Sequence, residues 1–222
     1  MRTSAEENYL KEIYNLELDH PQVTTSMLAE RFDYSAATVT GMLKKLARSG
    51  WVAYEPYQGV KLSDSGREIA LEVIRHHRLI ETFLTRVLDI PWDRVHEEAE
   101  KLEHVISEYL ESRIDEMLDH PSFDPHGSPI PSYDGAVREQ SRLLLADLAP
   151  GARAEIVEVN DRDPLMLAHL DRLHLHPQTI FEITAIEPLD GLITVRVEGQ
   201  NHILGPTTAR QIFVRRLSTE SD

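Results

Sequence analysis

The chain has 222 residues, of which 41% are hydrophobic and 27% are charged, and this balance is typical of a folded globular protein. No apolar run approaches the roughly 18 residues of a membrane span, and the N-terminus has no secretory apolar core, so we expect a cytoplasmic protein without membrane contact. The absence of cysteine excludes disulfides and thiolate metal sites, and the net charge of −15 argues against a simple nucleic-acid binder.

Five elements are predicted in the first 66 residues. Thr24 or Thr25 can cap the second helix, and Ser35 can cap the third, because hydroxyl side chains accept hydrogen bonds from the first turn of a helix. The elements are helices over residues 5–18, 26–32 and 36–49, followed by a β-hairpin over residues 51–54 and 60–62. This order is that of a winged helix-turn-helix domain, for which we predict the bounds 1–66.

The helix over residues 36–49 would be the one that reads DNA. Small and hydroxylated side chains in its first turn allow a close approach to base edges and phosphates, and lysines further along would contact phosphate. A helical hairpin that serves protein contacts is the alternative. The predicted contact residues are Thr25, Ser35, Ala36, Ala37, Thr38, Thr40, Gly41, Lys44, Lys45 and Lys61.

The middle of the chain is predicted to be helical and is strongly acidic. Residues 67–140 contain 8 basic and 17 acidic residues. Two stretches without glycine or proline, residues 69–88 and 93–118, have the pattern of amphipathic helices. We expect residues 93–118 to be helical, so that residues 67–118 hold two or three helices, and residues 120–135, which are rich in proline, glycine and serine, to form an ordered loop or linker.

Histidines and carboxylates gather in these helices at helical spacing. His96, Glu100, Glu103 and His104 are three or four residues apart, which places side chains on one face of a helix. Imidazole and carboxylate groups without thiolate suit Mn(II), Fe(II), Co(II) or Zn(II), and the many carboxylates favour the first two. A solvated acidic face is the alternative, because charge runs on helices are common without a metal.

Two further groups of histidines and carboxylates strengthen the prediction of a divalent-metal site. His77 and Glu81 have i, i+4 spacing in the helix over residues 69–88, and Asp124 and His126 follow in the proline-rich loop. A bound divalent cation would relieve part of the repulsion within this acidic region. We expect His76, next to His77, to point to solvent.

The last third of the chain is predicted to form a small β domain over residues 150–217. A helix over residues 137–148 precedes it, and Ala149-Pro150-Gly151 marks the boundary. The predicted strands cover residues 154–159, 179–186, 192–197, 201–204 and 211–217, with a helix over residues 164–173 between the first two. The fold class is therefore mainly α with a small β-barrel, and residues 67–140 form a helical domain between the two ends.

The chain resembles the DtxR/MntR metalloregulators, the iron- or manganese-dependent bacterial repressors related to the diphtheria toxin repressor. The resemblance covers nearly the full length, and its combination of motifs is specific. It rests on NYLKEIYNL, AERFDYSAATVTGMLKKLARSGWV, LSDSGREIA, HHRLIETFL, VHEEAEKLEHVISEYLESRID and HPSFDPHGSPIP. The C-terminal part is similar to the SH3-like, FeoA-type domain of the longer members. The resemblance implies a DNA-binding domain, a helical dimerisation domain and metal sites, with no enzymatic activity.

The resemblance also implies two ligand sets. An ancillary site would use His77, Glu81, His96 and a carboxylate from the β domain, which aligns best as Asp161, with Asp163 as the alternative. A primary site would use Glu100, Glu103 and His104 with Asn8 of the first helix. In the longer manganese-responsive members a thiolate and an imidazole from the proline-rich loop also enter, and Asp124 and His126 occupy those places in this chain.

Three positions depart from the pattern of the family. Asn8 stands where manganese regulators usually have Asp and iron regulators have Met, so an uncharged amide or the nearby Glu7 would replace a stronger ligand. Lys11 stands where short manganese regulators have Glu, which puts their two-metal geometry in doubt. Glu100 replaces the Cys of iron regulators. The resulting nitrogen and oxygen set favours Mn(II) over Fe(II), with Co(II), Zn(II) or Cd(II) as surrogates.

The resemblance implies a homodimer that binds near-palindromic, double-stranded operator DNA when metal fixes its geometry, and so represses metal-uptake genes. The apolar residues Val105, Leu110, Ile114 and Leu118 could form the dimer face or pack within one chain. Two other classes remain open: a metalloenzyme that uses the Glu and His groups, and a DNA-binding regulator that needs no metal. Within the family, activation in place of repression is a third alternative.

Overall fold

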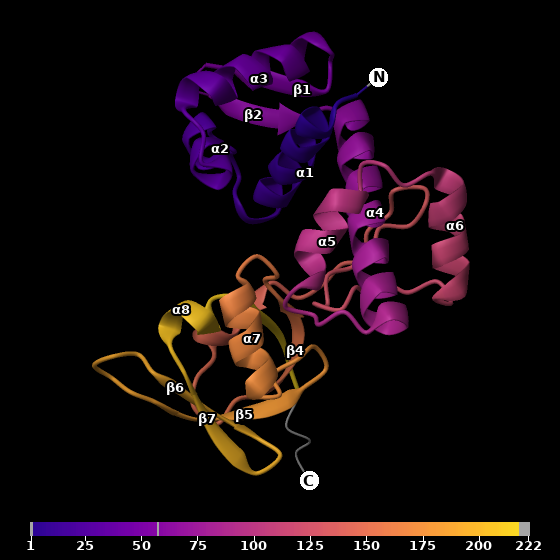
Figure 1. Ribbon diagram of the computed structural model, residues 1–222. Coiled ribbons are helices and arrows are strands. Elements are labelled where there is room, and N and C mark those ends of the chain that lie inside the picture. The colour runs from indigo at the N-terminus through magenta and orange to yellow at the C-terminus, as the bar shows by residue number, and fades with distance from the viewer. Residues whose placement is uncertain (1, 57, 218–222) are drawn as a thin grey trace. The chain divides into compact units, whose positions relative to one another are not determined.

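The computed structural model describes residues 2–56 and 58–217 (Figure 1). The chain divides into two compact units. The first unit contains the residues up to 77 together with residues 102–107 and 131–136, and the second contains residues 78–101, 108–130 and the remainder. Tyr57, in the turn of the predicted hairpin, lies outside the described residues.

The first unit has the helix and strand order of a winged helix-turn-helix, which confirms the predicted class. Thr3, Thr24 and Ser35 cap its first three helices, and Asp33, in the left-handed conformation at φ 53°, ends α2. The elements are α1 (Ser4–Asp19), α2 (Thr25–Phe32), α3 (Ala36–Arg48), the antiparallel strands β1 (Val52–Glu55) and β2 (Gly59–Leu62), and the start of α4 (Asp64–Leu88).

Buried apolar side chains from all three helices form the interior of this domain. Leu10 and Ile13 of α1, Leu28 of α2, and Leu43 and Leu46 of α3 are all fully buried. Glu6 of α1 pairs with Lys45 of α3 at 3.0 Å, which ties the first helix to the predicted reading helix.

The start of α4 depends on a glycine. A Cβ atom at Gly66 would lie 1.9 Å from the carbonyl oxygen of Trp51, so only glycine lets the helix pass so close to the residue before β1. This close approach fixes the start of α4 against the hairpin.

The prediction of one helix over residues 93–118 is wrong, and the alternative of a third helix between residues 67 and 118 is confirmed. The structure has α5 (Val95–Leu102) and α6 (Glu108–Met117), with a break between them. After Leu102 the chain turns, because the amides of Val105 and Ile106 both donate to the Leu102 carbonyl. The buried side chain of Glu103 is held by polar partners in the first unit, and these tertiary contacts override the helical pattern of the sequence.

The predicted helix over residues 137–148 is also wrong. This segment is extended, forms the short strand β3 (Leu143–Leu144), and ends in one 3-10 turn over Leu145–Asp147. Its backbone pairs with β8 (Ile212–Arg216), and the Gln140 side chain donates to the Gly127 carbonyl at 2.8 Å. Pairing with distant residues therefore decides the conformation of this segment.

The β domain is a six-stranded antiparallel sheet in the order β3-β8-β4-β5-β6-β7. In the described strands β3 and β7 are the ends of the sheet, and their pairings do not close it into a barrel. Buried residues of the sheet and of α7 form its core (Figure 1). The remaining elements are β4 (Arg153–Val159), α7 (Pro164–Arg172), β5 (Ile180–Ile186), β6 (Ile193–Val197), β7 (Gln200–Leu204) and α8 (Pro206–Ala209).

None of the described helices combines the length and the apolar character that crossing a membrane requires.

Candidate metal centre and nucleic-acid interface

Five predicted ligands meet in the second unit, and we call them the Glu81 cluster. Glu81 lies on α4, His96 on α5, and Asp161 just after β4, while Asp124 and His126 lie on the loop that follows α6. One ligand atom from each of Glu81, His96 and Asp161 lies within 4.8 Å of the others, and the same holds for Glu81, Asp124 and His126. Glu81 therefore belongs to both groups.

The side chain of Glu81 stands between two imidazoles. Its Oε1 is 3.1 Å from Nδ1 of His96, and its Oε2 is 3.7 Å from Nδ1 of His126. The Nδ1 of His96 is also 3.4 Å from Oδ2 of Asp161. The side chain of Glu81 has no exposed surface, so this carboxylate is directed entirely at the cluster.

The backbone fixes the orientation of the His126 imidazole. Its Nε2 lies 2.8 Å from the carbonyl oxygen of Trp92, which can only accept a hydrogen bond. This contact places the proton of a neutral imidazole on Nε2 and leaves the Nδ1 lone pair facing Glu81 and Asp124. The Nδ1 atom is buried and makes no hydrogen bond to any described residue, as expected of a metal ligand held by an outer partner.

The loop that carries Asp124 and His126 is fixed against the β domain. The amide of Val159 in β4 donates to the His126 carbonyl at 2.9 Å, and the Ser128 hydroxyl donates to Glu158 at 2.9 Å. A Cβ atom at Gly127, where φ is 90°, would lie 2.1 Å from the Val157 carbonyl oxygen. Only glycine permits this contact, so the sequence Asp124-Pro-His126-Gly127 is held close to β4.

Excess negative charge changes the protonation of the Glu81 cluster. Burial lowers the pKa of His96, but hydrogen bonds to Asp161 and Glu81 outweigh it and raise the pKa to about 10. Burial likewise lowers the pKa of His126, while Glu81 raises it, and the result is about 9. Burial and the Glu81 charge raise the pKa of Asp124 to about 7, although Arg78 opposes this shift. In the absence of metal, protons therefore supply the positive charge that this cluster needs.

We expect metal binding at the Glu81 cluster to release protons and to strengthen as the pH rises. A ligating imidazole must be neutral, and the two histidines are protonated at pH 8, below pKa values of about 10 and 9. Each released proton should raise the apparent Mn(II) affinity by about tenfold per pH unit. Calorimetry of Mn(II) binding in two buffers with different ionisation enthalpies would count the protons, and His126→Ala should release fewer. Binding without proton release would contradict this expectation.

The raised pKa values of His96 and His126 make the metal-free protein less stable as the pH rises, whereas metal binding strengthens. A histidine with a raised pKa contributes stability that is fully present below its unfolded pKa of about 6.5. That contribution is lost as the pH rises through the folded values of about 9 and 10. Bound metal replaces the lost positive charge in this range.

A second group of polar residues, the Glu103 cluster, lies within the first unit. It contains Glu7, Asn8 and Lys11 of α1, His77 of α4, and Glu103 and His104, which follow α5. The Oε2 atom of Glu103 is 2.5 Å from Nδ1 of His77, and its Oε1 atom is 3.2 Å from Nε2 of His104. His77 also stands four residues before Glu81, on the same face of α4.

Two features of the Glu103 cluster fit a metal. The Oδ1 atom of Asn8 is buried and accepts no hydrogen bond from any described residue. Such an atom is costly to bury unless a cation or donor completes its environment. His104 has Nδ1 at 2.7 Å from Glu7, so the carboxylate next to Asn8 lies beside a predicted ligand.

Electrostatics keep the central carboxyl of this cluster ionised. Burial opposes ionisation of Glu103, but the hydrogen bonds of His104 and His77 and the nearby Lys11 charge hold its pKa well below the usual range. Hydrogen bonds to Glu103 and Glu7 raise the pKa of His104.

Glu100 takes a different place from the other predicted ligands. Its Oε1 is 3.6 Å from Nε2 of His96, and its side chain is 54% exposed. It therefore stands at the outer edge of the Glu81 cluster, on the side of His96 opposite to Nδ1. Figure 1 shows the helix α5 that carries both residues.

Some contributing residues were not predicted from the sequence. The expectation that His76 points to solvent is wrong, because His76 is only 7% exposed and its Nδ1 is 3.2 Å from the Glu103 carbonyl oxygen. Trp92 had no role in the prediction, yet its carbonyl holds His126 and its ring stacks on the imidazole at 5.4 Å. No short motif in the sequence marks either contact.

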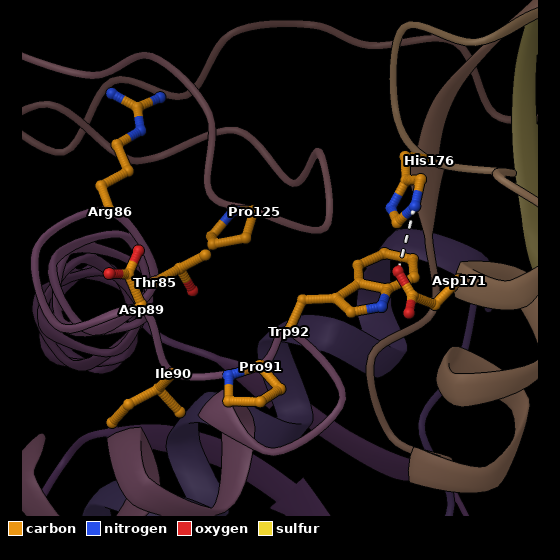
Figure 2. A pocket seen from close by; sticks show the side chains of 9 residues that line it. All are labelled: Thr85, Arg86, Asp89, Ile90, Pro91, Trp92, Pro125, Asp171 and His176. Atoms are coloured by element: carbon orange, nitrogen blue, oxygen red, sulfur yellow. Dashed lines mark ion pairs between the residues drawn. The ribbon is translucent and has the colours of Figure 1, made fainter.

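The ring of Trp92 also forms the wall of a shallow pocket of about 470 Å³ (Figure 2). On the pocket side its ring centre is 4.6 Å from that of His176, which pairs with Asp171 at 3.2 Å. Trp92 is 8% exposed, and its ring contacts both His126 and His176. It therefore links a predicted metal ligand to a residue that lines the pocket.

The predicted reading helix α3 presents the expected surface. Ser35 and the side chains of its first turn, as well as Gly41 and Lys44, are exposed, whereas Val39 is buried. Of the other predicted DNA contacts, Thr25 and Thr40 are half-buried, and Lys61 is exposed on β2. Lys45 lies 3.0 Å from Glu6 at the start of α1, so it links α1 to the reading helix.

Comparison with protein families finds three matches along the chain. Residues 1–60 match the N-terminal DNA-binding domain of iron-dependent repressors, and residues 63–132 match their metal-binding and dimerisation domain. Residues 143–216 match the FeoA domain.

Individual proteins agree with these matches. The chain is 38% identical over 125 residues to the iron-dependent repressor IdeR of Mycobacterium tuberculosis, covering 56% of this chain and 54% of the relative, so it spans about half the length of that protein. It is 35% identical over 162 residues to the diphtheria toxin repressor of Corynebacterium glutamicum, covering 70% of this chain and 71% of the relative. A solved structure of a manganese-dependent transcriptional repressor in complex with manganese is 38% identical, has a TM-score of 0.90, and shares 96% of this chain and 100% of that chain.

Proposed function

Because the chain belongs to the family of iron-dependent repressors related to the diphtheria toxin repressor, with a C-terminal FeoA domain, we propose that it is a metal-dependent transcriptional repressor. Members of this family are DNA-binding repressors and not enzymes, which answers the metalloenzyme alternative. The observation that carries the proposal is the Glu81 cluster, in which buried nitrogen and oxygen donors converge in a chain that also has an exposed reading helix.

We propose Mn(II) as the effector. The donors of both clusters are imidazoles, carboxylates and one amide, and a thiolate is impossible because the chain has no cysteine. Hard oxygen donors suit Mn(II), whereas softer ligands would favour other metals. Fe(II) is the alternative, since the relatives similar in sequence are named iron-dependent. Co(II), Zn(II) and Cd(II) are expected to act as surrogates.

The proposed role of the Glu103 cluster follows from its position on α1. When bound, the metal supplies positive charge that holds the ligands of α1 to those that follow α5. Glu7 and Asn8 lie on the same helix as Glu6, which pairs with Lys45 of the reading helix at 3.0 Å. We infer that restraining α1 also restrains α3. In a homodimer this would fix the separation of two reading helices to match a near-palindromic operator.

The proposal can be tested by fluorescence anisotropy with chelator-treated protein. The probe is promoter DNA of a metal-transporter gene that neighbours the gene for this protein. A repressor of this kind would stop metal uptake when metal is abundant. Parallel titrations use Mn(II), Fe(II), Co(II) and Zn(II). Tight binding only with metal supports the proposal, and the order of the metals identifies the effector. Equal binding in chelator would instead support a regulator that needs no metal.

An exposed apolar face on α6 is the proposed dimer contact. Tyr109, Leu110 and Met117 are 76%, 50% and 66% exposed. The predicted stripe is divided, because Val105 is exposed like Leu110, whereas Ile114 and Leu118 are each only 7% exposed. An exposed patch of this kind marks an interaction site.

We expect the double substitution Tyr109→Glu and Leu110→Glu to convert the dimer into a monomer. Two carboxylates would have to be buried in the interface, at a cost of several kcal/mol. Light scattering after size-exclusion chromatography would measure the mass. Ser112→Glu, on the exposed surface of the same helix, is the control and should leave the mass unchanged. A dimeric double variant would exclude this face.

A further inference from the structure

The best-buried lysine ion pair of the described residues lies inside the Glu103 cluster. The Nζ atom of Lys11 is 2.6 Å from Oε1 of Glu103, and the two side chains are 12% and 0% exposed. Nearly all of this ion pair is therefore removed from water, where the attraction between opposite charges is stronger than at the surface.

Lys11 occupies the position of a cation among potential metal ligands. It lies three residues after Asn8 and four after Glu7 on α1, so the three side chains share one face of the helix. Glu103 Oε1, the atom that Lys11 contacts, is also the oxygen that faces Nε2 of His104 at 3.2 Å. An ammonium group has three donors and no lone pair, so it neutralises the carboxylate but cannot act as a ligand.

We propose that Lys11 is a built-in competitor for the metal at Glu103, and that it makes the Glu103 cluster the weaker of the two metal sites. This inference rests on the proposed function. A metal that binds Glu103 must displace the ammonium group from Oε1, whereas His96, which contacts Glu81 and Asp161 in the other cluster, can itself ligate the metal once it loses its proton. The Glu81 cluster then fills at lower metal concentration, and Lys11 sets the higher concentration at which α1 is engaged.

The competition has a second consequence for the metal-free protein. Lys11 provides a positive charge 2.6 Å from the buried carboxylate of Glu103 when no metal is present. Removing it should destabilise the metal-free state and strengthen metal binding at the same time. A lysine that merely supported the ligands would give the opposite result for binding, because its loss would disorder the site.

The test measures Mn(II) binding by the electron paramagnetic resonance signal of free Mn(II). Titrations use the intact chain and an Asp161→Ala chain, in which the Glu81 cluster lacks one carboxylate. In both, Lys11→Met and Lys11→Gln should bind Mn(II) at the Glu103 cluster about tenfold more tightly or better, because a repelling charge is removed. Lys11→Arg keeps the charge and should keep binding weak. Lys11→Gln keeps a hydrogen-bond donor and so guards against loss of folding in Lys11→Met.

A matched control comes from another ion pair of α1. The Nε atom of Arg31 is also 2.6 Å from a glutamate, Glu12, but this pair involves no predicted ligand. Arg31→Met should leave Mn(II) affinity unchanged. Thermal denaturation supplies an independent readout, in which Lys11→Met lowers the melting temperature without metal and gains more from added Mn(II) than the unaltered chain does.

The outcomes distinguish failure of the Lys11 competition from failure of the proposed repressor function. Equal or weaker Mn(II) binding by both Lys11→Met and Lys11→Gln overturns the competition, even if the unaltered chain binds metal and operator normally. If the unaltered chain binds neither Mn(II) nor operator DNA, the proposed function fails, and unchanged Lys11 variants then overturn this inference with it.

Discussion

Replacing Glu81 with glutamine is expected to abolish metal-dependent operator binding. Glu81 has a fully buried side chain and faces His96 and His126, so it joins both groups of ligands in the second unit. Removing its charge should weaken Mn(II) binding by about 100-fold or more, since even changes to outer partners of metal ligands cost 10–100-fold. Operator affinity measured with Mn(II) should then fall to the metal-free value.

The substitution Glu81→Gln keeps the shape of the side chain, so loss of binding can be separated from loss of folding by circular dichroism. Glu97→Gln is the matched control, because Glu97 is exposed on α5 and belongs to neither cluster. Metal-dependent operator binding that survives in Glu81→Gln would show that the Glu81 cluster does not control DNA affinity.

Ala37→Glu should abolish operator binding without affecting metal binding, in contrast to Glu81→Gln, which should weaken both. Ala37 is exposed in the first turn of α3, two residues after the cap Ser35. A carboxylate there would repel phosphate and block close approach, with an expected loss of about 100-fold in operator affinity. The same charge at a helix N-terminus stabilises the helix by about 0.3–1 kcal/mol, so unfolding would not explain the loss.

The chain offers a control at the equivalent position of another helix. Ala5 is exposed and stands two residues after the cap Thr3 of α1. Ala5→Glu introduces the same charge in the same local context but outside the reading helix, and it should retain operator affinity within about twofold. Comparable losses in Ala5→Glu and Ala37→Glu would mean that overall charge, and not contact by α3, decides the affinity.

Helix caps and the spacing of apolar residues in the sequence predicted the helix-turn-helix correctly. The helix predicted over residues 36–49 is α3, Ala36–Arg48, because Ser35 supplies a cap and the apolar residues repeat at helical spacing. The failures occur where distant contacts decide. Residues 93–118 contain no glycine or proline, yet the helix ends after Leu102, where Glu103 is drawn to partners on α1 and α4. Residues 137–148 extend because β8 pairs with them.

The candidate site shows the same division between local and distant information. Helical spacing related His96 to Glu100, and the structure places them 3.6 Å apart. Helical spacing could not show that Asp124 and His126 lie with Glu81, because 42 residues, which include α5 and α6, separate Glu81 from Asp124 in the sequence. The position of Lys11 on Glu103 was likewise invisible, since the two residues are 92 positions apart.

The attachment of the Asp124–His126 loop to β4 has a consequence for how this protein can evolve. A descendant that lost its FeoA domain would lose Asp161 outright, together with the Val159 amide that holds the His126 backbone. The Glu103 cluster draws every member from residues before 105 and would survive the deletion. Under the proposed function, the FeoA domain and the Glu81 cluster would therefore be inherited together. A lineage without that domain would have to bind its effector metal at the Glu103 cluster, where Lys11 contacts Glu103.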